Sequence, residues 1–284
     1  MSATRALERA PQGVRRARSR NGGRALRTLV SRSLLDRRRS IIAWGISAGL
    51  LCAFTAAVYP SMQDSIGKAV EGYPEGIKEA FGVGQLATVE EYLSVEAFNL
   101  FVPLALAFFA IRSIVRSLPA AEESGSLDTL LSAPVPPRLV AAAAFATTAL
   151  ALLFVLAIIG AFTWAAAQLS GADLGVGPLV AGVANVWPLT LLFAALALVA
   201  NGLRPGAGMV TGVASGALVA MYVIDLLGKL ADPIEPLRYA SVFRYYGTAI
   251  EDGIDPIAFA GITLTATALA WLGAFLFDRR DVLG

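Results

Sequence analysis

The stretch at positions 122–131 holds the side chains of this sequence that are best suited to bind another surface. Its carboxylates and leucines are Glu122, Glu123, Asp128, Leu127, Leu130 and Leu131. Ser126 is a candidate cap for a short helix that Pro134 would end, with the leucines on one face. Carboxylates pair with basic groups, and exposed leucines anchor contacts. On these residues alone two interpretations stay open: a helix that docks on a partner, and an ordinary solvated loop.

Residue types needed for catalysis are scarce. The sequence has no histidine, and its single cysteine, Cys52, lies inside an apolar block, which excludes a disulfide framework and a cysteine/histidine metal cluster. The pairs Gly67-Lys68 and Gly228-Lys229 lack the earlier glycine and the following Ser or Thr of a phosphate-binding loop. We therefore expect no cofactor in this chain, no ATP hydrolysis by the chain alone and no nucleic-acid partner.

Long apolar blocks dominate the rest of the chain. The composition is 56% hydrophobic and 15% charged, with a mean hydropathy of +0.66. A soluble domain carries about 25% charged residues. The blocks have the length of about 20 residues that a helix needs to cross hydrocarbon, where the backbone must pair within the protein. The sequence predicts an all-α integral membrane protein with six transmembrane helices, at residues 41–59, 97–115, 139–169, 176–200, 207–227 and 257–277.

The basic residues predict how these helices cross the membrane. Twelve arginines lie in the first 40 residues. With that end in the cytoplasm, 18 of the 23 basic residues fall on the inner side, as the positive-inside tendency requires. Both termini are then cytoplasmic, and we expect the plasma membrane of a prokaryote. A cleaved signal peptide is the weaker alternative, because its basic and apolar parts would be much shorter.

The segment before the first span divides into two predicted parts. Residues 1–22 are rich in arginine without a hydrophobic period, which indicates a disordered basic tail. Residues 23–40 place Leu26, Leu29 and Leu34 at helical spacing, with arginines on the other side. This pattern predicts an amphipathic helix that lies in the inner headgroup layer and contacts membrane lipid.

Three segments resemble the ABC-2-type permeases, the membrane subunits of many ATP-binding-cassette (ABC) exporters. Residues 122–135 read EESGSLDTLLSAPV, which is similar to the family's pattern of two acids, a glycine, Leu-acid, Leu-Leu-Ser and Pro-Val. Residues 241–247 read SVFRYYG and are similar to a Ser-Pro-Phe-x-Tyr-Tyr segment, except that Val242 replaces the proline. Residues 277–282 read FDRRDV and resemble the family's Phe-x-Arg-Arg-Asp close.

The resemblance implies a role for the segment after the second span. In that family a short cytosolic helix there rests in a groove of a separate ATP-binding subunit, present in two copies, which holds ATP and Mg²⁺. The positions carried over as ATPase-coupling residues are Glu122, Glu123, Gly125, Leu127, Asp128, Leu130 and Leu131. The carboxylates would pair with basic groups of the partner, and the leucines would anchor the contact.

Small residues at four-residue spacing line two predicted spans. They are Gly45, Gly49 and Ala53 in the first span, and Gly208, Gly212 and Gly216 in the fifth. Such stripes let two helices approach closely, either within one bundle or between subunits. The resemblance places the first and fifth spans beside the interface of two permease subunits. We therefore expect a dimer with an identical or related chain.

The spans offer few charges. We therefore expect an apolar path and an amphipathic substrate, such as a drug, an antibiotic or a lipid. Candidate path residues on spans two and five are Phe98, Asn99, Phe101, Phe108, Met209 and Tyr222. The leading interpretation is the permease subunit of an ABC exporter. A self-sufficient carrier or channel, and a membrane scaffold for the maturation of another protein, are the alternatives.

Overall fold

The protein is a bundle of long helices. The computed structural model describes residues 12–71, 88–126, 136–204 and 206–280, without the side chains of 12–22, 62–71 and Asp232. Within these residues, six helical segments are long and apolar enough to span a membrane, which confirms the predicted all-α fold. They are Gly23–Ser61, Val89–Glu123, Pro137–Ser170, Val176–Leu203, Ala207–Leu230 and Pro256–Arg279.

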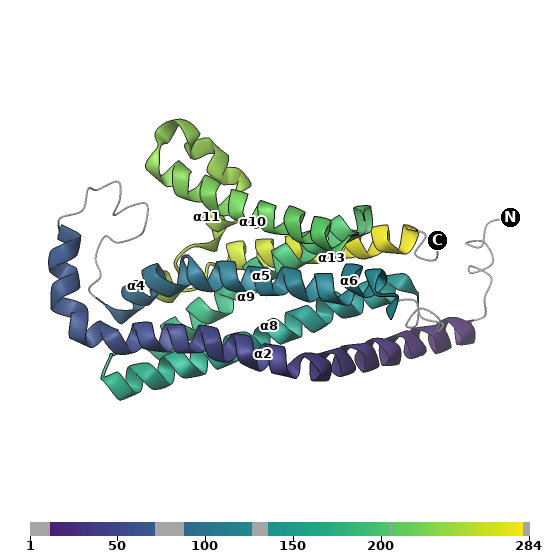
Figure 1. Ribbon diagram of the computed structural model, residues 1–284, viewed down its shortest axis with the longest axis horizontal. Helices are drawn as coiled ribbons and strands as arrows, with labels where there is room; N and C mark the ends of the chain where they lie inside the picture. Colours follow the sequence, from purple (N-terminus) through teal and green to yellow (C-terminus); the bar gives the residue numbers. More distant parts are fainter. Residues whose placement is uncertain (1–11, 72–87, 127–135, 205, 281–284) are drawn as a thin grey trace.

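The first of these segments belongs to one continuous helix, α2 (Gln12–Glu71). This differs from the predicted division into a disordered tail up to residue 22, a separate interfacial helix at 23–40 and a span. Proline is absent from Gln12 to Tyr59, and Arg, Ala and Leu are good helix formers, so the helix continues through Gly22 and Gly23 and through the change in polarity. The last turns run at an angle to the rest (Figure 1), and Pro60 within the helix accounts for a bend.

The second membrane segment is broken rather than continuous. It comprises α4 (Val89–Leu93), the π-helix η1 (Ser94–Phe98), α5 (Phe101–Ser117) and α6 (Pro119–Glu123). Pro103 explains the break. In a regular helix its ring would clash with the carbonyl oxygen of residue 99, four positions earlier, and it has no N–H to donate to that oxygen. Thr88 and Glu91 form a reciprocal capping box at the start of α4, with bonds of 3.2 and 3.1 Å.

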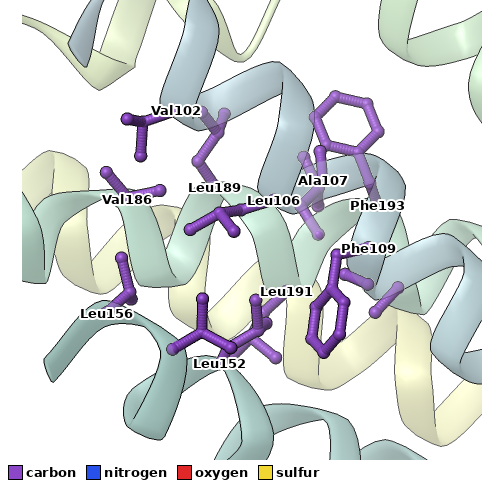
Figure 2. Close-up of a cluster of buried hydrophobic side chains, with 14 of the residues drawn as sticks. Val102, Leu106, Ala107, Phe109, Leu152, Leu156, Val186, Leu189, Leu191 and Phe193 are labelled. Atoms are coloured by element: carbon purple, nitrogen blue, oxygen red, sulfur yellow. The ribbon is translucent and has the colours of Figure 1, made fainter. Parts of the chain in front are cut away.

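Helix α9 (Val176–Leu203) lies at the centre of the bundle. It contacts α5, α8 (Pro137–Ser170), α10 (Ala207–Leu230) and α13 (Pro256–Arg279), whereas α2 packs mainly along α8. Apolar residues cover all sides of α9, which is typical of a helix surrounded by others. Figure 2 shows side chains of α5, α8 and α9 meeting in the core, among them Val102, Leu106, Phe109, Leu152, Leu156, Val186, Leu189 and Phe193.

The two ends of the bundle differ. Helix α2 begins and α13 ends at the same end (Figure 1), which we call the terminal end and which also holds α6. The opposite end, here the loop end, holds three short helices between α10 and α13: the 3-10 helix η2 (Asp232–Ala240), α11 (Phe243–Tyr246) and α12 (Ala249–Asp252).

Helices α9 and α13 cross in close contact at Gly273. A Cβ atom there would lie 2.8 Å from the backbone carbon of Leu198 and from the nitrogen of Val199. These neighbours are backbone atoms of a central helix, so they cannot move aside as a flexible side chain can. Gly273 is therefore required for this crossing.

We expect Gly273→Ala to lower the free energy of unfolding by roughly 1–3 kcal/mol, because it overpacks the crossing. Gly261→Ala on the same helix is the matched control, since a Cβ there meets no atom within 4 Å. Thermal unfolding of the purified protein in mild detergent measures both. Equal melting temperatures for the two variants would contradict the close contact.

Candidate functional site

An ion pair holds α6 against the end of α13 at the terminal end. The guanidinium of Arg280 donates to Oε2 of Glu122, and both side chains are mostly buried. A second nitrogen of Arg280 donates to the backbone oxygen of Asn201 at 2.6 Å. Arg280 therefore joins α6 to the last turn of α9. Arg280 also lies over the ring of Phe277, 5.2 Å from its centroid.

The neighbouring carboxylate holds the start of α10. Oε1 of Glu123 accepts a hydrogen bond of 2.7 Å from the backbone N–H of Ala207, the first residue of that helix. The first N–H groups of a helix have no partner within it and favour negative charge nearby. Gly206, with φ at +130°, precedes Ala207 in a conformation that favours glycine. Glu123 is thus a cap supplied from another helix.

Gly125 ends α6 in the left-handed conformation, with φ at +71°, and its N–H donates to the oxygen of Glu122 at 2.9 Å. This is a backbone role. The other predicted coupling positions, Leu127, Asp128, Leu130 and Leu131, lie outside the described residues. The structure thus shows Glu122 and Glu123 with partners inside their own chain, whereas the sequence interpretation assigned them partners on another subunit.

Arg37 is a functional candidate that the sequence interpretation missed. Its guanidinium donates to the backbone oxygen of Ser113 at 3.1 Å and to the hydroxyls of Ser113 and Ser117 at 2.5 Å each. Thr148 of α8 donates to the Ser113 hydroxyl at 2.9 Å. These bonds join α2, α5 and α8. Arg37 and Leu34 are three residues apart and lie on the same half-buried face of α2. This spacing was the feature of the sequence that could have indicated that Arg37 points toward the bundle.

The two glycine stripes behave differently. A Cβ at Gly45 would lie 2.8 Å from Cδ1 of Ile158, and one at Gly49 would lie 3.2 Å from Cβ of Phe162, both on α8. These glycines pack within the chain, which is the other role that their spacing allows, and Ala53, also on α2, is half-buried. The stripe on α10 is open, because a Cβ at Gly208, Gly212 or Gly216 would meet no atom within 4 Å.

The predicted substrate-path residues do not gather around one space. Phe98 is buried, and its backbone oxygen accepts from the hydroxyl of Tyr246 at 3.1 Å. Phe101 and Phe108 are exposed. Asn99, Met209 and Tyr222 are half-buried, and the Tyr222 ring packs edge-on against Phe243 with centroids 5.4 Å apart.

An apolar cavity of about 470 Å³ lies elsewhere, between α9, α10, α13 and the segment that joins η2 to α11. None of the six predicted path residues lines it. The sequence could not reveal the cavity, because its walls come from three spans whose relative positions are set by packing. The single cue in the sequence was Ser241–Tyr245, which forms one wall.

A buried carboxylate lies at the loop end. Asp225 of α10 is 5% exposed and pairs with Lys229 and with Arg238 of η2, at 3.1 Å each. The two cations neutralise this carboxylate in place. The pairs attach η2 to the last turns of α10.

The comparisons with known proteins identify the family. Residues 29–278 match the family described as the multidrug efflux system permease Rv1217c, C-terminal domain. The chain belongs to this family. No curated protein and no solved structure matches the chain significantly. The protein is thus the permease component of a multidrug efflux system, and the match includes α6, the cavity and most of α2 and α13.

An efflux permease must change shape between its two ends, and α6 is connected to the helices that can do so. Glu123 contacts the start of α10, and Glu122 contacts the end of α13 through Arg280. Within the described chain these contacts hold α6 by charge-assisted bonds, which are stronger than neutral ones. Helix α6 is therefore attached to two spans.

We expect Arg280→Gln to destabilise the permease by about 1–3 kcal/mol, because Glu122 is left partly buried without its cation. A double-mutant cycle with Glu122→Gln should give a coupling free energy of about 0.5–3 kcal/mol, measured by thermal unfolding in detergent. Arg279→Gln is the matched control, since Arg279 is exposed and stacks on Phe275. Strictly additive effects of the two substitutions would contradict the ion pair.

Proposed function

We propose that this permease is the membrane subunit of an ABC-2-type exporter, driven by two copies of a separate ATP-binding subunit. The observation that carries the proposal is the attachment of α6 to both α10 and α13. The segment 122–131, with the sequence of a coupling helix, therefore starts at the point where a push from outside the bundle reaches two spans at once. ATP and Mg²⁺ would be held by the partner, since this sequence has no phosphate-binding loop.

The terminal end would face the cytoplasm of a prokaryotic cell. The basic residues near the ends of the spans support this orientation. Arg138, Arg204, Arg279 and Arg280 lie at helix ends at the terminal end, and Arg37, Arg38 and Arg39 lie within α2 just before its apolar part. An ATP-binding subunit is a cytoplasmic protein, so the same orientation brings α6 within its reach. The exposed arginines of α2 would contact the headgroups of membrane lipid.

A second permease subunit, identical or related, would pack on α10. This helix is the least buried of the six candidate spans, and the three glycines of its stripe, Gly208, Gly212 and Gly216, face open space. Small residues at four-residue spacing allow two helices to associate closely in lipid. The α2 stripe is already used against α8, so the proposed interface is confined to the α10 side.

Co-purification in mild detergent tests the coupling role. The permease would be expressed with the ATP-binding subunit encoded beside its gene. We expect Leu127→Ser/Leu131→Ser to retain about tenfold less ATP-binding subunit than the wild type, because two apolar anchors are lost. Leu203→Ser is the control, since Leu203 is an exposed leucine at the same end. If the wild-type permease retains no ATP-binding subunit, the ABC assignment is wrong.

A large side chain on the glycine stripe of α10 tests the proposed dimer. We expect Gly212→Trp to shift the purified permease from dimer to monomer, since the indole would stand where the second helix must approach. Ala260→Trp on α13 places the same side chain on another exposed surface. Molar mass from light scattering in detergent distinguishes the two states. An unchanged mass for Gly212→Trp would place the interface elsewhere.

A further inference from the structure

The cavity at the loop-end half of the bundle has the size and lining of a small-molecule site. Its volume of about 470 Å³ falls within the range of roughly 300–1,000 Å³ that is usual for drug-sized ligands. Leu192 and Leu196 of α9, Met221 of α10 and Ile262 of α13 line it. No charged side chain is among its lining residues in the described part of the chain. This lining favours an uncharged, mainly apolar group.

One rim of the cavity is polar and is held in place. The Ser241 hydroxyl donates to the backbone oxygen of Met221 at 2.6 Å, which attaches the wall segment to α10. The hydroxyl of Tyr245 donates to the oxygen of Tyr239 at 3.3 Å, and Arg244 stacks 4.1 Å above the Tyr239 ring. Tyrosines with one apolar and one wet side are typical of a membrane interface. A ligand would thus find an apolar space next to a polar rim.

The ion pair between Asp225 and Arg238 holds η2, which precedes the rim, against α10. Arg238 reaches Asp225 because Gly228 has no side chain, and a Cβ there would overlap Cγ of Arg238. Arg238 and Arg244 belong to η2 and α11, next to the wall segment, and Asp225, the buried carboxylate among the described residues, is already neutralised. Nothing in this arrangement recognises a cation. The cavity therefore favours neutral molecules over cationic ones.

The walls of the cavity are also the helices that α6 holds. Helix α10 contributes Met221 and starts at Ala207, the partner of Glu123. Helix α13 contributes Gly261 and ends beside Arg280, the partner of Glu122. A movement of α6 therefore reaches both walls. A space formed only to accommodate membrane lipid would need no such connection.

We propose that this cavity binds the apolar part of uncharged, amphipathic efflux substrates, with their polar part at the Ser241–Tyr245 rim. The proposal rests on the efflux function and specifies its substrate class. It differs from the path predicted on the second and fifth spans, because those residues lie outside the cavity.

Photolabelling tests the site without any ATP-binding subunit. The purified permease, in nanodiscs of one phospholipid, would be labelled with 3-trifluoromethyl-3-(m-iodophenyl)diazirine, a small neutral apolar probe, and mapped by mass spectrometry. We expect labelling of Leu192, Met221 and Val242 that falls about tenfold in Gly261→Phe, because the ring fills the space that the probe needs. A Cβ at Gly261 meets no atom within 4 Å, so the new side chain can leave the helix backbone without a clash at its first atom.

Ala260→Phe is the matched control, since Ala260 is exposed, adjacent and not part of the lining. Labelling at the exposed Trp271 reports that each variant is folded in the membrane, and Ala258→Leu is a second way to fill the cavity. Excess Nile red, a neutral drug-sized dye, should compete for the cavity residues, whereas excess ethidium, a cation, should not.

Two outcomes overturn the proposal. Equal labelling in the wild type and in both cavity-filling variants would show that the probe does not enter the cavity. Labelling by a diazirine phospholipid that Nile red does not displace would show that membrane lipid is the occupant. Neither result affects retention of the ATP-binding subunit, which tests the ABC proposal. Failed co-purification likewise does not affect the labelling, so each proposal can be overturned without the other.

Discussion

The need to pair every backbone polar group within the chain governs this structure, since hydrocarbon offers no partners. Where the second segment leaves regular helix near position 99, the N–H of Asn99 donates to Ser94 at 2.7 Å and that of Leu104 donates to Leu100 at 3.2 Å, so the break keeps its hydrogen bonds. Threonines in the spans bond to carbonyls of their own helix, as Thr163 does to Ile159 at 2.8 Å. Among the described residues, the ion pairs lie at the two ends of the bundle.

At these ends, charged bonds hold one helix against another in a single position, which apolar contacts alone cannot do in lipid. Apolar surfaces gain little from meeting each other in hydrocarbon, so close packing at small residues and polar bonds must hold the helices. Gly273 brings α13 onto α9, and Gly45 brings α2 onto α8. Arg280 then joins the end of α13 to α6, and Arg37 joins α2 to α5. Packing sets how far apart the helices lie, and the charged bonds set their position along one another.

The six spans could be predicted from the sequence because length and hydropathy are local properties, and the break after Phe98 had a visible cause in Pro103. The ends of the helices were less predictable. Helix α2 continues through its polar half because polarity alone does not stop a helix. The glycine stripes could not be told apart, since a contact within the bundle and one between subunits need the same spacing. The pairing of Glu122 with Arg280 joins residues 158 positions apart, and only the fold reveals it.

The arrangement of α10 and α13 around α9 connects the two ends of the permease. Both outer helices are attached to α6 at the terminal end and form the cavity at the other, whereas α9 is surrounded and has the least freedom to move. A helix is stiff along its axis, so a shift imposed at Ala207 or Arg280 appears at the cavity with little loss. The outward faces of α10 and α13 meet only a few neighbours within the chain. These two helices are thus less enclosed than α9, and the cavity lies between them and the central helix.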